Sequence, residues 1–221
     1  DMQPDWTWHK VKSHAASHML YDSTRGVGKR LHSDQTSAEA TESAQGTITA
    51  FTSNGFTVNA GTSNDFYVND SGKTYVAWNW KANGGTTSSN TDGSITSTVQ
   101  ANTTAGFSIL TYSANATAGA TVGHGLGTTP SVVILKKRSG TGDGNWMVGH
   151  KAYVGNAAEN VALDGTGVPV AADDTAGSTW NRTAFTSTVF TLGDGQAGDW
   201  TGRTNRSGYT MVAYCFAEIK G

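Results

Sequence analysis

The chain has 221 residues, of which 36% are hydrophobic and 14% charged, with a formal net charge of −2. So low a charge content argues against a chain held open by self-repulsion, and the lack of a basic excess gives no electrostatic support to nucleic-acid binding. A single cysteine excludes an intrachain disulfide framework, and no segment reaches the about 18–20 apolar residues that span a bilayer.

The first part of the chain is typical of short strands separated by turns. Residues 4–12 are expected to form a strand in which Trp6 and Trp8 share one face. Further strands are expected at residues 19–21, 29–31, 48–51, 55–58 and 75–80. Trp78 and Trp80 share one face of the last of these strands. All four tryptophan rings are expected to pack in the core or against a sheet.

The second part follows a stretch rich in glycine, serine, threonine and asparagine and continues the same pattern. Strands are expected at residues 94–99, 107–112, 120–122, 132–136, 146–148, 160–163, 184–185, 190–192 and 209–218. The last is apolar on both faces, which predicts a central strand and a buried, unreactive Cys215. No helical period is found. The sequence therefore predicts an all-β protein of antiparallel, jelly-roll-like β-sandwiches.

Three segments of the first part recur in the second part in the same order. They are PDWTWHKVKS and PSVVILKKRS, from Pro4 and Pro130; FTSNGFTV and FTSTVFTL, from Phe51 and Phe185; and YVAWNW and MVAYCF, from Tyr75 and Met211. Recurrence in order is the signature of a repeat. We therefore expect two tandem repeats, residues 1–82 and 93–221, joined by a linker at residues 83–92.

The second repeat carries two expected strands, 107–112 and 120–122, that have no counterpart ahead of Pro4. The first repeat is therefore expected to lack its opening strands and to present open sheet edges. Open edges invite pairing with another chain. We expect the missing strands to come from upstream sequence or from a neighbouring subunit by β-strand addition.

Several of these segments resemble a repeat domain of tail- and fibre-type structural proteins of bacteriophages, especially marine phages. They are GFSILTYSANATAGATVGHGLGTTPSVVILKKRS, NWMVGH and YTMVAYCFAEIKG, and the first repeat resembles the companion repeat that precedes it in such proteins. The resemblance implies an outer, multi-copy component of the extracellular virion that is not an enzyme. The implied partners are other virion subunits in a homo-oligomer, of which a trimer is one form. It supplies no catalytic residues.

Residues suited to metal binding or catalysis are few. His14 and His18 are four residues apart but have no carboxylate or cysteine nearby, and His124 lies in a glycine-rich turn where the backbone is expected to satisfy its ring. Residues 193–199 have oxygen ligands at alternate positions, with too few carboxylates to fill a calcium site. The Asp173–Asp174 pair is expected to be a solvated loop. No cofactor is expected, and calcium at residues 193–199 remains the alternative.

Aromatic residues in polar loops are candidate contacts for a glycan. The candidates are Trp200, Phe66, Tyr67, Trp180 and Tyr153, with Arg203 close to Trp200. A sugar ring stacks its C–H face on an aromatic ring while neighbouring polar groups bind its hydroxyls. The alternative is that these rings close the ends of the sandwich or the contacts between subunits. The second functional hypothesis is therefore a lectin-like module that binds a host surface glycan.

Overall fold

The computed structural model describes residues 2–41, 44–63, 67–140, 144–155, 159–166, 170–171, 179–195 and 202–219. Within these ranges the named strands assemble into four sheets, and the one helix is the short α1 (Gly202–Asn205). Every pairing between named strands is antiparallel. The prediction of an all-β fold with antiparallel sheets is confirmed.

The first sheet has three strands with β1 in the middle. Its order is β2 (Met19–Asp22), β1 (Trp6–Val11) and β5 (Tyr75–Trp80). Alternation of large apolar and smaller polar side chains along β1 directs Trp6 and Trp8 to one face and Thr7 to the other. Across the strands, Trp6 lies opposite Trp80 and Trp8 lies opposite Trp78.

The second sheet has eight strands and contains the same three-strand arrangement at its centre. Its order is β13 (Val170–Ala171), β12 (Glu159–Ala162), β11 (Met147–His150), β10 (Pro130–Ser139), β15 (Thr210–Ala217), β8 (Phe107–Ser113), β7 (Ser97–Asn102) and β6 (Ser88–Asn90). β10 lies between β11 and β15, as β1 lies between β2 and β5. Val132 pairs with Phe216, and Ile134 with Tyr214.

The register of the two sheets agrees with the sequence alignment. Trp6 and Trp80 lie opposite each other on β1 and β5. The residues that align with them, Val132 and Phe216, lie opposite each other on β10 and β15. The pair Trp8 and Trp78 has the same relation to Ile134 and Tyr214. This agreement is what the repeat hypothesis requires.

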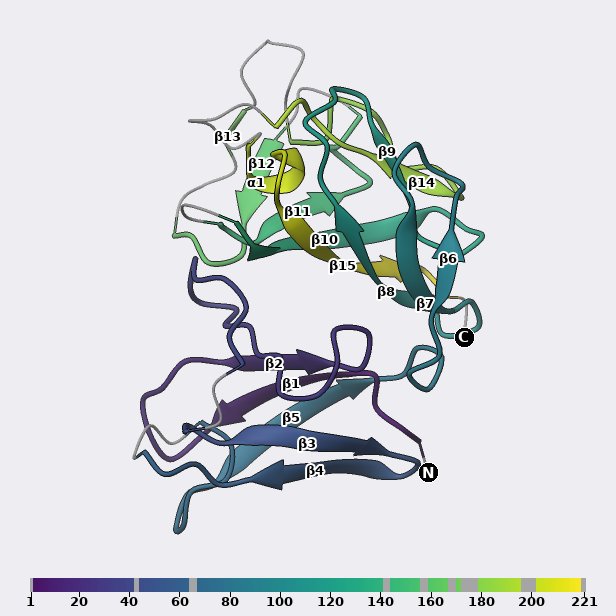
Figure 1. Cartoon of the computed structure of the whole chain (residues 1–221). Helices are drawn as coiled ribbons and strands as arrows, with labels where there is room; N and C mark the ends of the chain where they lie inside the picture. The colour runs from purple at the N-terminus through teal and green to yellow at the C-terminus, as the bar shows by residue number, and fades with distance from the viewer. Residues whose placement is uncertain are drawn as a thin grey trace.

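The four sheets stack as layers (Figure 1). The hairpin of β3 (Thr47–Thr52) and β4 (Gly55–Asn59) covers the outer face of the three-stranded sheet through a cluster that includes Met19, Tyr21 and Ile48. The pair β9 (Thr121–Gly123) and β14 (Val189–Thr191) covers the outer face of the eight-stranded sheet. The inner faces of the two larger sheets therefore pack against each other.

Trp6 lies at the centre of the core between these inner faces and is 1% exposed. Its ring stacks on Tyr214 of the other sheet with centroids 4.5 Å apart, and on Phe107 at 5.9 Å. Trp80 contacts it from its own sheet at 4.3 Å. Because this cluster takes side chains from both sheets, the two halves of the chain share one buried core.

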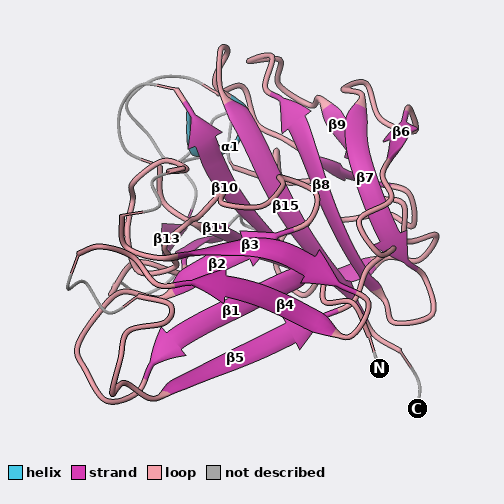
Figure 2. Ribbon diagram, turned by 60° about the horizontal axis from the view of Figure 1, so that its bottom comes forward, coloured by secondary structure: helices cyan, strands magenta, loops and turns pink. Residues whose placement is uncertain are grey.

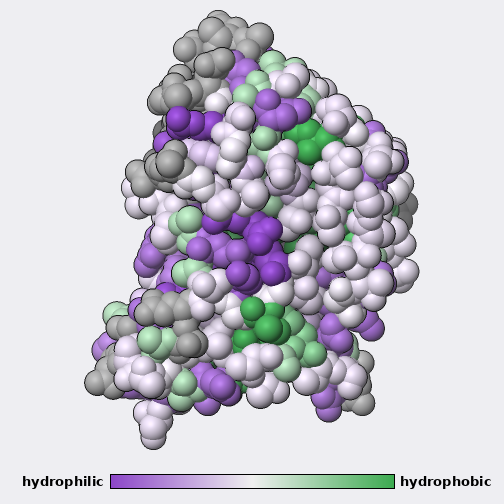
Figure 3. Space-filling view, in the orientation of Figure 1, coloured by the Kyte–Doolittle hydropathy of each residue, from purple (hydrophilic) through white to green (hydrophobic). Residues whose placement is uncertain are grey.

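A buried polar network links the same two halves. Tyr214 donates its hydroxyl to Asp22 Oδ2 at 2.6 Å, and Arg25 Nε pairs with the same oxygen at 2.5 Å. Glu39 binds both Arg25 and Arg138, at 3.1 Å and 2.9 Å. Burial opposes ionisation of Glu39, but its bonds to the two arginines outweigh this and lower its pKa. On one face of the molecule, a hydrophilic band lies between the halves (Figure 3).

Parts of the chain differ from the sequence-based expectation. Within the predicted linker, Ser88–Asn90 forms the edge strand β6. The backbone N–H groups of Asn83 and Gly85 donate to Gln100 Oε1, at 3.2 and 3.1 Å, so this segment is held against β7. Residues 29–31 form only isolated bridges, and α1 has too few residues to show a helical period.

Candidate functional site

Strand β5 lies at the end of its sheet. One edge of β5 pairs with β1 along all six residues. Within the described part of the chain, no strand pairs with its other, outer edge. The aligned strand of the other sheet, β15, is central instead, with β10 on one side and β8 on the other. Figure 2 shows β5 at the margin of the molecule. The described first half thus has no strand in the position that β8 holds beside β15.

The open edge leaves an aromatic side chain in solvent. Trp78 is 47% exposed, whereas Tyr214, its aligned residue in β15, is completely buried. Of the two places expected for Trp78, the core and the surface of a sheet, the ring occupies the second. Its ring meets the edge of Trp8 with centroids 6.4 Å apart.

Trp8 is fixed in turn by His18. The Trp8 indole Nε1 donates to His18 Nδ1 at 2.7 Å, and the two rings meet edge to face. Burial lowers the pKa of His18 although the charge of Asp34 acts in the opposite direction. A neutral His18 can accept this hydrogen bond near neutral pH. The bond fixes the ring of Trp8, which Trp78 contacts.

Side chains that could bind a metal do not gather in the part of the chain that the structure describes. No group of three or more His, Cys, Asp or Glu side chains converges there. As expected, His124 is satisfied by backbone: its Nε2 donates to Thr186 O at 3.2 Å, and its Nδ1 accepts from Leu126 N–H at 3.2 Å. Burial raises the pKa of Cys215 to about 12, which keeps it a thiol. Residues 173–174 and 196–199 lie outside the described residues.

The candidate glycan contacts that the structure describes do not form one exposed aromatic surface. Trp180 is completely buried in the core of the second half, against Phe185 and Phe190, and offers no face to a sugar. The polar residues next to Trp180 gave no sign of this burial. Trp200 and Phe66 lie outside the described residues.

The three remaining candidates are partly buried and lie on different parts of the molecule. Tyr67 packs on the cluster beneath the β3–β4 hairpin, with His32 at 5.7 Å between ring centroids. Tyr153 packs on the outer core of the eight-stranded sheet, and Arg203 belongs to α1. Glycan contact stays a prediction, and of its described candidates the structure excludes Trp180.

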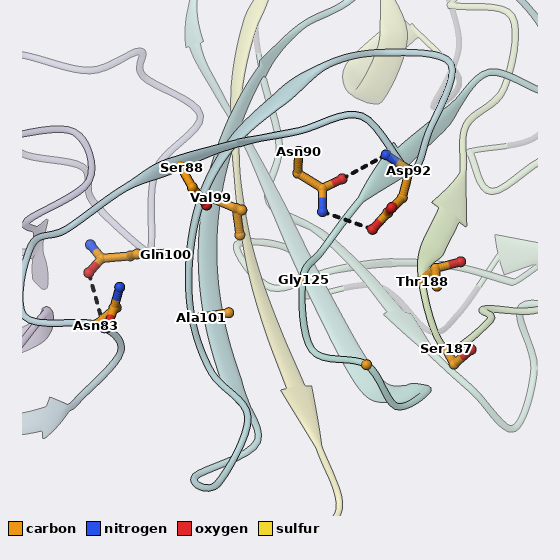
Figure 4. Close-up of a pocket in the computed structure, with 11 residues that line it drawn as sticks. Asn83, Ser88, Asn90, Asp92, Val99, Gln100, Ala101, Gly125, Ser187 and Thr188 are labelled. Atoms are coloured by element: carbon orange, nitrogen blue, oxygen red, sulfur yellow. Dashed lines mark hydrogen bonds between the residues drawn. The ribbon is translucent and has the colours of Figure 1, made fainter.

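A polar groove of about 400 Å³ lies between residues 83–92, which were expected to be a linker, and the turns at residues 125–127 and 187–188 (Figure 4). Its lining residues include Asn83, Asn90, Asp92, Gln100, Ser187 and Thr188. Asn90 Nδ2 donates to Asp92 Oδ2 at 2.9 Å, so these two side chains bind each other. Among the described residues that line it there is no aromatic ring. Apart from those in β7, its residues come from segments that the sequence marks as loops.

The comparisons place the whole chain in one family. Within the described residues, no helix is both long enough and apolar enough to cross a bilayer. No curated protein and no solved structure matches the chain. One family model, described as a domain of unknown function (DUF7483), matches residues 1–221, and the chain belongs to that family.

Proposed function

We propose that the chain is a non-enzymatic structural module, an outer component of a phage virion, that joins neighbouring subunits through the open edge of β5. The observation that carries the proposal is the unpaired outer side of β5 with a half-exposed Trp78. The resemblance of several segments to phage tail and fibre repeats supports the virion setting. Assembly by backbone pairing needs no cofactor and no catalytic group.

The β5 edge lacks the features by which proteins protect sheet edges. Such protection comes from very short strands, charged or proline residues within the strand, or bulges. β5 has six residues, reads YVAWNW, and pairs with β1 without a register shift. The edge strands of the eight-stranded sheet, β13 and β6, have only two and three residues. On the other side of the first sheet, Leu31 bridges to Leu20 and covers β2.

The proposal is tested by the mass of the full chain in solution. Sedimentation of the wild-type chain should show a concentration-dependent oligomer, and Trp78→Lys should shift it to monomer because a charge at the edge opposes strand pairing. The matched control is Leu163→Lys, which replaces another partly exposed apolar side chain, 40% exposed, away from β5. A wild-type chain that stays monomeric at high micromolar concentration would contradict the proposal. So would an oligomer that both variants leave intact.

A further inference from the structure

The chain contains its own template for the strand that would pair with β5. In the second sheet, β8 runs antiparallel along the outer side of β15, the strand that aligns with β5. Phe107 of β8 lies opposite Phe216, and Ile109 lies opposite Tyr214. Both β8 side chains belong to the core between the sheets.

The alignment transfers these positions to β5. Phe216 aligns with Trp80 and Tyr214 aligns with Trp78, so the vacant positions are those opposite the two tryptophans. On the other face, Cys215 faces Ser108 in the template, and its counterpart in β5 is Asn79. Asn79 is exposed whereas Cys215 is completely buried, as the loss of a neighbouring strand requires.

We propose that the partner of β5 is an extended segment that runs antiparallel to it and has the alternation of β8. Large apolar side chains of this segment lie opposite Trp78 and Trp80, as Phe107 and Ile109 lie in β8, and a small side chain stands between them, as Ser108 does. The inference rests on the proposed function and names the chemistry of the partner. Pairing supplies affinity through backbone hydrogen bonds, and the alternate side chains supply specificity.

The template also indicates where the partner strand begins. Ala217 N–H donates to Gly106 O at 2.7 Å where β8 begins, and Gly106 has a φ of +63°. A Cβ on Gly106 would come within 2.9 Å of Ala217 O and within 2.6 Å of the Ile219 side chain. The counterpart of Ala217 beside β5 is the exposed Lys81. A glycine is therefore expected at the start of the partner strand, opposite Lys81.

The first experiment supplies the strand within one chain. A second copy of residues 97–129, which hold β7, β8 and β9, is joined ahead of Pro4. Residue 129 precedes Pro130, with which Pro4 aligns, so the fusion repeats the natural spacing. The amides of Ala77 and Asn79, which face away from β1, should exchange with solvent at least about tenfold more slowly than in the unextended chain. The emission of Trp78 should shift to shorter wavelength as its ring leaves water.

The matched control carries Phe107→Ser and Ile109→Ser in the added copy only. These changes remove the apolar side chains opposite the tryptophans and keep the length of the extension. The control should leave the exchange of the Ala77 and Asn79 amides at the rate of the unextended chain. Should the extended chains fail to fold, a synthetic peptide of residues 103–116 added to the wild-type chain gives the same readout.

The outcomes test the β8-like partner and the proposed assembly of copies separately. Equal protection by the extension and by its control overturns the inference, because the alternation then has no role. An oligomer that Trp78→Lys dissolves, combined with no protection by either donor, keeps the proposed function and overturns the β8-like partner in favour of pairing between two β5 edges. Protection by the donor in a chain that is always monomeric keeps the inference and contradicts assembly between copies.

Discussion

Replacing Trp6 by alanine should weaken the junction between the two sheets more than any exposed substitution. Truncation of a buried aromatic side chain costs about 3–5 kcal/mol, and the stacked rings of Tyr214 and Trp80 place Trp6 in the upper part of that range. At about 2–4 °C per kcal/mol for a chain of this size, the melting temperature should fall by about 8–20 °C. Trp6→Phe keeps a ring in the stack and should cost less than half as much.

The assay is urea unfolding followed by tryptophan fluorescence and far-UV circular dichroism. The control is Trp78→Ala, whose half-exposed ring should cost about 1 kcal/mol or less. The two signals should change together in every variant, because the central cluster holds side chains of both sheets. The reasoning is refuted if Trp6→Ala costs no more than Trp78→Ala. It is also refuted if the first half unfolds separately while the eight-stranded sheet remains.

Two further predictions concern buried polar groups. Burial lowers the pKa of His9 from 6.5 to about 4, so the folded state binds fewer protons than the unfolded state; stability is full above pH 6.5 and falls by on the order of 3 kcal/mol as the pH drops towards 4. His9→Gln should lack most of this slope when the free energy of unfolding is measured from pH 4 to 7, and an unchanged slope would assign it to other groups. Tyr214→Phe removes the hydroxyl donated to Asp22 and should cost about 1–2 kcal/mol, whereas Arg25→Met leaves that carboxylate buried without its cation and should cost about 3–5 kcal/mol. Thermal melts that reverse this order would contradict the network.

Local pattern was enough to predict most of the strands. Alternation around Trp6 predicts β1, the Asn54–Gly55 signal predicts the β3–β4 hairpin, and the two apolar faces around Cys215 predict the central β15. The recurring segments align β1 with β10 and β5 with β15, and in the structure the aligned strands pair in the same way in each sheet. These features depend on neighbours within a strand or on aligned positions, both of which are visible in the sequence.

Contacts between the halves could not be predicted. Asp22 and Tyr214 are 192 residues apart, and nothing in either segment marks them as partners. The packing of the two inner faces buries Trp6 yet leaves Trp78 half exposed, although both rings share one alternation pattern. Trp180 shows the opposite error, because its ring is completely buried although its neighbours along the chain are polar. Burial of an aromatic residue depends on which sheet lies over it.

The layered arrangement restricts the direction in which such a module can grow. The inner faces of the two larger sheets cover each other, and the β3–β4 and β9–β14 pairs cover the outer faces. Stacking of further sheets onto a face would first have to displace one of these pairs. Growth by backbone pairing proceeds sideways instead, across the strands, and each added strand lengthens the sheet by about 4.8 Å. Pairing at β5 would therefore widen the three-stranded sheet and leave the thickness of the stacked layers unchanged.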